Sequence, residues 1–93
     1  MEIAKASLVE ATAGREQGKR YFVIDLEGEY LFLADGKTRK LEAPKKKKRK
    51  HVRLVQTQEL RIAEKIRSNE KITNSELRKA IAILSDDNPN QEG

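Results

Sequence analysis

The clearest structural signal in the chain is KRYFVIDLEGEYLFLADG, residues Lys19–Gly36. It contains two runs rich in aromatic and branched side chains, Tyr21–Leu26 and Tyr30–Ala34, and such residues favour strands. The segment Glu27–Glu29 between the runs contains a glycine, so the two runs predict an antiparallel hairpin. The stretch ends in Asp35-Gly36, which is a strong turn pair.

Side-chain alternation along the first run predicts which residues share a face. Because neighbouring side chains of a strand point to opposite faces, Phe22, Ile24 and Leu26 are expected together. Tyr21 and Val23 are expected on the other face.

Three further short strands are predicted around the hairpin. The segment KASLVEATAG, residues 5–14, precedes it, Thr38–Leu41 follows the turn pair, and His51–Gln56 forms the last strand. Five short strands with tight turns predict a small β-barrel, because closure hides the edges of a sheet.

The second half of the chain changes to a helical period. Leu60, Ala63 and Ile66 recur at helical spacing and predict a first helix. Thr73 followed by Glu76 is a capping-box pattern, which predicts the start of a second helix. The apolar stripe of this second helix consists of Leu77, Ala80, Ile81 and Leu84.

The predicted fold class is therefore mainly β with C-terminal α. Residues 1–56 are expected to form the barrel, residues 57–84 a helical appendage and residues 85–93 a polar, disordered tail. Two helices of this length are marginal alone, so they are expected to pack on the barrel, on each other or on a partner.

Composition narrows the class of protein. The chain has 93 residues and no cysteine, which excludes disulfide bonds and thiolate metal sites. No basic segment followed by an apolar run marks the N-terminus, and no apolar run has the length of a membrane span. A soluble, cytoplasmic protein without a cofactor is expected.

Positive charge is concentrated in one region. The net charge is +5, and between Gly36 and Val55 ten Lys and Arg stand against a single acid, Glu42. The centre of this region is PKKKKRKHV, Pro44–Val52, which is predicted to be a loop held between two strands. A solvated charged loop and a nuclear address are the alternatives to a phosphate-binding surface.

A second basic feature is TAGREQGKR, residues Thr12–Arg20. Gly14 and Gly18 permit a tight turn that could present backbone N–H groups and the cations Lys19 and Arg20 to a phosphate. The spacing does not match the phosphate loop of nucleotide hydrolases, and a plain turn is the alternative.

Two stretches together resemble a known family. VEATAGREQGKRYFVI resembles the KOW motif, a strand, a basic glycine turn and a second strand. ADGKTRKLEAPKKKKRKHVRL is similar to KOW-type large-subunit ribosomal proteins of archaea and eukaryotes. The resemblance spans about residues 3–56. It implies an SH3-like barrel that binds ribosomal RNA through its loops.

The resemblance and the charge pattern give one set of candidate RNA-binding residues. The match to the KOW turn implies RNA contact by the glycines and cations of residues 14–19. The match to the ribosomal stretch implies contact by the basic residues of 37–51, and the charge pattern adds Arg20 and Arg53. The set is Gly14, Arg15, Gly18, Lys19, Arg20, Lys37, Arg39, Lys40, Lys45, Lys46, Lys47, Lys48, Arg49, Lys50, His51 and Arg53.

The sequence leaves one alternative class of function open and argues against another. KOW motifs also occur in transcription elongation factors, where they contact proteins, so the alternative is an adaptor that docks on ribosomal or transcription proteins. An enzyme, a metal site and a small-molecule substrate are not expected. The lone His51 stands among cations, and Asp25, Glu27 and Glu29 surround a solvated turn.

The four aromatic residues favour contact with the RNA backbone over base stacking. Phe22 and Phe32 are predicted to be core residues. Tyr21 and Tyr30 are expected to be partly buried, although they could form a stacking platform on neighbouring strands.

Overall fold

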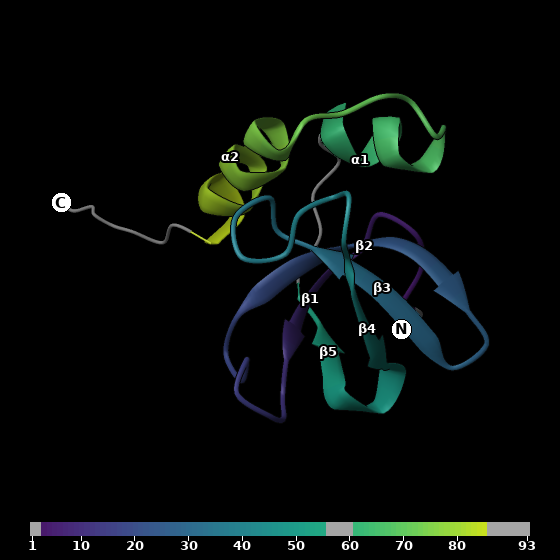
Figure 1. The fold of residues 1–93 in the computed structure, drawn as a ribbon, viewed down its shortest axis with the longest axis vertical. Helices are drawn as coiled ribbons and strands as arrows, with labels where there is room; N and C mark the ends of the chain where they lie inside the picture. The colour runs from purple at the N-terminus through teal and green to yellow at the C-terminus, as the bar shows by residue number, and fades with distance from the viewer. Residues whose placement is uncertain (1–2, 56–60, 86–93) are drawn as a thin grey trace, which may run out of the picture.

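The computed structural model describes residues 3–55 and 61–85. A five-stranded antiparallel sheet is followed by two helices (Figure 1). The prediction of a mainly β chain with C-terminal α is thereby confirmed. The strands are β1 (Leu8–Ala11), β2 (Arg20–Glu27), β3 (Tyr30–Ala34), β4 (Lys45–Lys48) and β5 (Val52–Leu54), and the helices are η1 (Arg49–His51, a 3-10 turn), α1 (Arg61–Arg67) and α2 (Asn74–Ser85).

The order of the strands in the sheet is β4-β3-β2-β1-β5. The two edge strands are consecutive in the chain and are joined by η1. Backbone hydrogen bonds hold η1 in place, from Arg49 N–H to Glu29 O and from Thr12 N–H to His51 O, each 2.8 Å. No ladder joins β4 to β5 in the part of the chain that the structure describes, so strand pairing does not close the sheet.

The predicted hairpin is confirmed as β2 and β3. Gly28 and Glu29 connect the two strands, and Gly28 has a φ of +63°. A two-residue connection needs such positive φ values to match the twist of the strands. Glycine adopts them without the steric cost of a Cβ atom.

A β-bulge changes the predicted alternation along β2. The register with β3 shifts between Val23 and Asp25. Phe22 and Ile24 share one face as predicted, but Leu26 packs with Tyr21 and Val23 on the opposite side. The prediction was wrong for Leu26 because an extra residue in one strand reverses the faces beyond it.

The fourth strand lies elsewhere than predicted. Thr38–Leu41 forms no strand, because the Asp35 carboxylate accepts hydrogen bonds from Lys37 N–H, Arg39 N–H and the Thr38 hydroxyl, each 2.8 Å. These bonds fold the segment into a compact turn. The lysine run, predicted as a loop, is instead the edge strand β4 with η1 after it. His51 consequently lies in η1 and not at the start of a strand.

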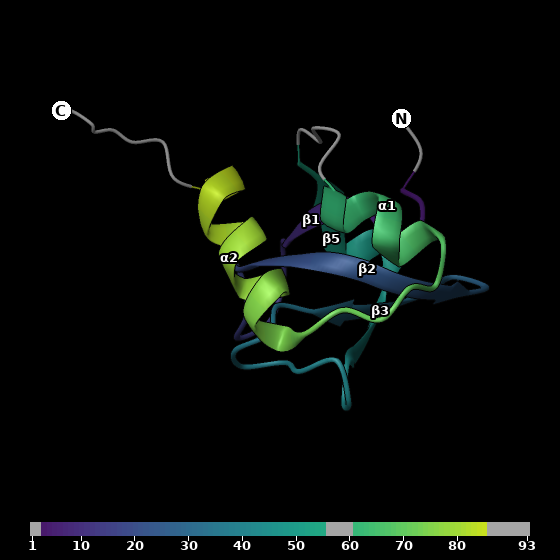
Figure 2. The same ribbon diagram turned by 90° about the horizontal axis from the view of Figure 1, so that it is seen from above.

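The sheet buries apolar side chains on both of its faces. One cluster lies between the sheet and the helices, and its buried members include Leu8, Phe22, Ile62, Ile66 and Leu77. Both helices lie over β2 on this side (Figure 1 and Figure 2). The other cluster lies within the curve of the sheet and contains Val9, Ala11, Tyr21, Val23, Leu31, Leu33 and Val52. The helices thus cover one of the two apolar faces of the sheet.

The two helices largely follow their sequence signals. The Thr73 hydroxyl accepts a hydrogen bond from Glu76 N–H at 3.1 Å, and the Glu76 carboxylate accepts one from Thr73 N–H at 2.9 Å, so the capping box is confirmed. In the stripe of α2, Leu77 and Ala80 are buried and the other two members are half-buried against the core. Gln56 and Leu60 lie outside the described residues, as do residues 86–93 of the predicted tail.

Side-chain bonds fasten α2 to the loop after β3. Asn74 Oδ1 accepts from Leu41 N–H and Asn74 Nδ2 donates to Glu42 Oε1, both at 2.8 Å. Arg78 donates to the carbonyl of Gly36 at 3.0 Å. The hydrogen bond from Asn74 holds the pKa of the Glu42 carboxyl below its usual value. Neither described helix is long and apolar enough to cross a membrane.

Candidate nucleic-acid interface

Strand geometry sorts the lysines of β4 into two rows. Lys46 and Lys48 stand opposite Phe32 and Tyr30 of β3, whereas Lys45 and Lys47 stand opposite the buried Leu33 and Leu31. Successive side chains of a strand point to opposite faces. We call Lys46 and Lys48 the outer row, and Lys45 and Lys47 the inner row.

The inner row shares one carboxylate of the glycine turn. Lys45 Nζ lies 3.2 Å and Lys47 Nζ 3.4 Å from the two oxygens of Glu16, and Lys47 also donates to Ala13 O at 3.2 Å. Only 10% of the Lys47 side chain is exposed. The hydrogen bond from Lys45 holds the pKa of the Glu16 carboxyl below its usual value. The inner row therefore ties β4 to the turn between β1 and β2.

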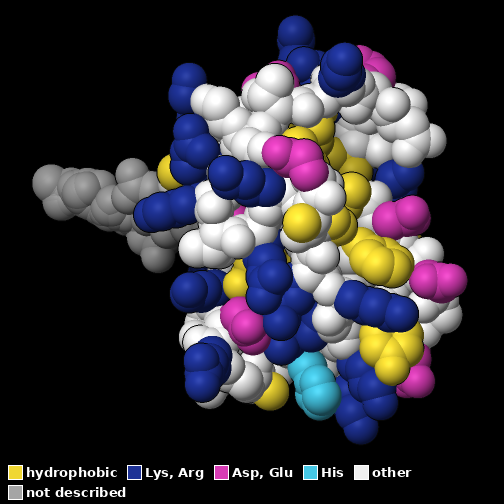
Figure 3. All heavy atoms as spheres, viewed as in Figure 1, with side chains coloured by type: hydrophobic (Ala, Val, Ile, Leu, Met, Phe, Trp, Pro, Cys, Tyr) yellow, Lys and Arg dark blue, Asp and Glu magenta, His cyan; other side chains and the backbone are white. Residues whose placement is uncertain are grey.

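The outer row has aromatic rings as neighbours instead of carboxylates. Lys46 Nζ lies 4.6 Å from the centroid of Tyr30, and Lys48 Nζ lies 6.0 Å from the same centroid. Within the described residues, no carboxylate lies at ion-pair distance from either ammonium group. The exposed Lys50 follows in η1. Dark blue side chains gather over β4 and η1 in Figure 3. This edge of the sheet therefore keeps uncompensated positive charge.

Three predicted arginines have partners inside the protein. Arg20 and Arg53 share one oxygen of Glu10, at 3.2 Å and 3.3 Å. Arg49 donates to the carbonyl of Ile3 at 3.3 Å. Arg53 keeps 57% of its side chain exposed, so it is the arginine of the three that can most readily meet a ligand.

The glycine turn is held by hydrogen bonds of its own backbone. Gly14 and Gly18 have φ values of +84° and +92°, as a tight turn requires. The N–H groups of Gln17, Gly18 and Lys19 donate to carbonyls within or beside the turn. These three N–H groups therefore have partners within the protein. The cations that the turn does expose are the side chains of Arg15 and Lys19.

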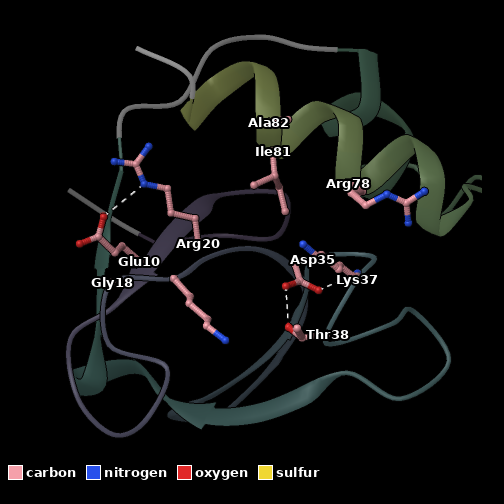
Figure 4. A pocket seen from close by; sticks show the side chains of 10 residues that line it. Glu10, Gly18, Arg20, Asp35, Lys37, Thr38, Arg78, Ile81 and Ala82 are labelled. Atoms are coloured by element: carbon pink, nitrogen blue, oxygen red, sulfur yellow. Dashed lines mark hydrogen bonds and ion pairs between the residues drawn. The ribbon is translucent and has the colours of Figure 1, made fainter. Parts of the chain in front are cut away.

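A groove of about 530 Å³ brings together parts of the chain that are distant in sequence (Figure 4). Its walls come from β1, from the end of the glycine turn, from the turn after β3 and from α2. Ile81 points into it from the helix. The lining residues are Glu10, Gly18, Lys19, Arg20, Asp35, Lys37, Thr38, Arg78, Ile81 and Ala82. Two predicted basic segments thus meet here beside a helix that was not assigned to the site.

The charge of the groove is mixed. Lys19, Arg20, Lys37 and Arg78 are offset by Glu10 and by Asp35. Burial alone would raise the pKa of Asp35, but hydrogen bonds from the backbone N–H groups of residues 37–39 and from the Thr38 hydroxyl lower it further than burial raises it. Asp35 is therefore ionised at neutral pH. The outer row, in contrast, has no carboxylate at ion-pair distance within the described residues.

The remaining candidates lie in η1 and in the turn after β3. Lys37 and Lys40 are exposed, whereas Arg39 and His51 are half-buried. The carbonyl of Arg39 accepts hydrogen bonds from the N–H groups of Asp35 and Gly36, at 2.8 Å and 3.0 Å.

The sequence did not indicate Arg78, Ile81 or Phe32 as site residues, whereas Tyr30 was considered as part of a stacking platform. Arg78 directly follows the buried Leu77, and nothing in a helical pattern brings it near Lys19. The period-2 pattern of β3 did carry a signal for Phe32, because Leu31 and Leu33 occupy the opposite face.

No protein-family model matches the chain, and no curated protein matches it.

Proposed function

We propose that this chain is an RNA-binding protein of the KOW type, which acts on ribosomal RNA in the cytoplasm. The observation that carries the proposal is the outer row, with Lys46 and Lys48 on an edge strand and Lys50 beyond it, all without a carboxylate partner in the described residues. Lysines in such a row neutralise phosphates and release the counterions of the nucleic acid.

The mode of binding that this arrangement supports is recognition of the phosphate backbone. Ammonium groups on flexible stems place charge near phosphates but read few base edges. Lysines on an edge strand also keep it from pairing with another chain. Protection of the edge needs charge but no ligand. Only binding measurements therefore distinguish protection of the edge from phosphate binding.

We propose further that the sheet belongs to the SH3-like barrels. Three features support this: the strand order, the glycine turn between β1 and β2 where the KOW resemblance lies, and the three-residue η1 between the edge strands.

A second function, docking on ribosomal or transcription proteins, is favoured by one observation. Ile83 on α2 is 67% exposed and lies beside Ile62 and Ala80 in a shallow groove between the helices. Removing the helices would uncover Leu8 and Phe22 of the sheet, so truncation is a poor test. Ile83→Asp tests it without disturbing the core, and loss of partner proteins with RNA binding intact would support docking.

The test of the main proposal is sedimentation of cell extract on a density gradient, with detection of this chain. Co-migration with large ribosomal subunits at about 50 mM salt, with release as salt rises, is expected for docking on phosphates. A chain that stays at the top of the gradient at the lowest salt would refute stable binding to ribosomal RNA.

A further inference from the structure

The outer face of β3 and β4 carries two aromatic rings beside two lysines. Tyr30 and Phe32 are two residues apart on β3, and they pair across the strands with Lys48 and Lys46. Hydrophobic side chains alternate with Lys or Arg side chains over this part of the surface in Figure 3. The sheet therefore presents a ladder of rings and cations next to the lysine edge.

These two rings do not serve the core as the other aromatic residues do. Tyr21 is 1% exposed and Phe22 is 2% exposed, and each belongs to one of the two apolar clusters. Tyr30 and Phe32 are half-buried and belong to neither cluster. The prediction that Phe32 is a core residue was therefore wrong, since Leu31 and Leu33 fill the core from this strand.

A lysine occupies the space between the rings. Lys46 Nζ lies 4.6 Å from the centroid of Tyr30 and 6.0 Å from the centroid of Phe32. An ammonium group over a ring at an exposed site is held only weakly. A nucleobase can displace it and stack on the ring, and the ammonium group then remains close to the phosphate of that nucleotide.

The spacing of the rings favours unpaired nucleotides. Side chains two residues apart on a strand are separated by about 7 Å. That is about twice the 3.4 Å rise of stacked bases in a duplex, so bases on both rings have to be unstacked from each other. Unpaired loops and bulges supply such bases, whereas a continuous helix does not.

We propose that Tyr30 and Phe32 form a stacking site for two unpaired nucleotides of an RNA loop or bulge, with Lys46 and Lys48 on their phosphates. The inference rests on the proposed RNA-binding function and names the kind of RNA that the protein selects. Charge complementarity identifies the occupant, because the rings lie within the lysine row that lacks carboxylate partners. The protein then combines backbone contact with base stacking, which the sequence alone did not favour.

The test compares two RNAs of equal phosphate number, a hairpin with an unpaired uridine loop and a continuous duplex. Fluorescence anisotropy at one fixed salt concentration gives the affinity of the intact chain for each. The double variant Tyr30→Leu with Phe32→Leu keeps apolar side chains at both positions but removes the ring faces. We expect it to bind the hairpin about tenfold or more weakly and the duplex less than twofold more weakly. Ile83→Ala, an exposed apolar position on α2, is the matched control and should change neither affinity.

A second readout needs no variant that could disturb folding. The chain has no tryptophan and two tyrosines, and Tyr21 is buried. Stacking of uridine on Tyr30 should therefore quench part of the tyrosine fluorescence of the wild-type protein when the hairpin binds. Binding of the hairpin without quenching would refute stacking even if the leucine variant fails to fold.

The outcomes separate this inference from the function beneath it. If the wild-type chain binds neither RNA, the proposed RNA-binding function fails and the inference fails with it. In a second outcome, the wild-type chain binds both RNAs while the leucine variant keeps its affinity for both or loses affinity for both equally. That result would refute stacking and leave RNA binding intact. Selective loss of the hairpin supports the stacking site.

Discussion

Replacing Gly36 by alanine should disrupt the packing of α2 against the turn that follows β3. Gly36 has a φ of +78° and lies against the start of α2, where an added Cβ atom would stand 2.2 Å from the carbonyl oxygen of Asn74 and 3.1 Å from the Arg78 nitrogen. Both contacts involve helix backbone, which cannot turn aside as a flexible side chain can. The substitution therefore has to push the helix away from the turn.

The expected cost has three parts. Left-handed backbone costs an alanine roughly 1 kcal/mol. Forcing extra volume into a packed joint costs about 1–3 kcal/mol. Displacement of the helix also weakens the bond from Leu41 N–H to Asn74 and the bond from Arg78 to the Gly36 carbonyl, each worth about 1 kcal/mol. We expect a loss of about 3–5 kcal/mol, a large share of the stability of a small domain.

Urea denaturation followed by circular dichroism measures this loss, and Gly28→Ala is the matched control. Gly28 also has a positive φ, +63°, but an added Cβ atom meets nothing within 4 Å. It should lose only about 1 kcal/mol. Equal losses for the two variants would refute the reasoning, because they would mean that α2 is not seated against Gly36.

Three further outcomes are expected. Leu77→Ala should lower the free energy of unfolding by about 2–5 kcal/mol in urea titrations, because Leu77 is fully buried between α2 and the sheet; a loss below 1 kcal/mol would contradict that packing. Thr73→Ala should cost about 1 kcal/mol by removing the cap of α2, and an unchanged urea midpoint would show that the capping box does not contribute. Lys65 and the Thr73 N–H lower the pKa of Glu76, so its contribution to stability is complete above the usual carboxyl pKa near 4.3 and is lost as pH falls through the lowered value. The melting temperature of the wild-type protein should therefore decrease as the pH is lowered below about 4, and it should decrease less steeply in Glu76→Gln. Identical pH profiles for the two proteins would contradict this assignment.

Local signals predicted the hairpin and the helices because neighbouring residues determine them. The glycine connection fixes the β2–β3 pairing, and the Thr73–Glu76 box fixes the start of α2. The fourth strand could not be found in this way. Four lysines have low strand propensity, and Lys45–Lys48 becomes a strand because it pairs with β3 across the Asp35 turn.

The sequence predicts which residues bring positive charge to the candidate site, but it does not predict which of them are paired with carboxylates. The sequence indicates where cations gather, yet Glu16 and Glu10 from other segments decide which of them have a carboxylate partner. Two of the four lysines in β4, Lys45 and Lys47, thereby contact the glycine turn. Arg78 reaches the groove only because α2 folds back over the sheet, and no local pattern records that contact.

The two rows of β4 permit a direct test of the central claim. The double variants Lys46→Gln with Lys48→Gln and Lys45→Gln with Lys47→Gln each lower the net charge of +5 by two, on the same strand and on opposite faces. The measurement is the slope of log affinity for large-subunit ribosomal RNA against log salt concentration, with melting curves to confirm that both variants are folded.

If the outer row binds phosphates, its variant should flatten the slope by about 1.4–1.8 through the loss of two contacts. The inner-row variant should keep the wild-type slope, because its ammonium groups already face Glu16. Equal slopes for the two variants, or a flatter slope for the inner row, would contradict the account.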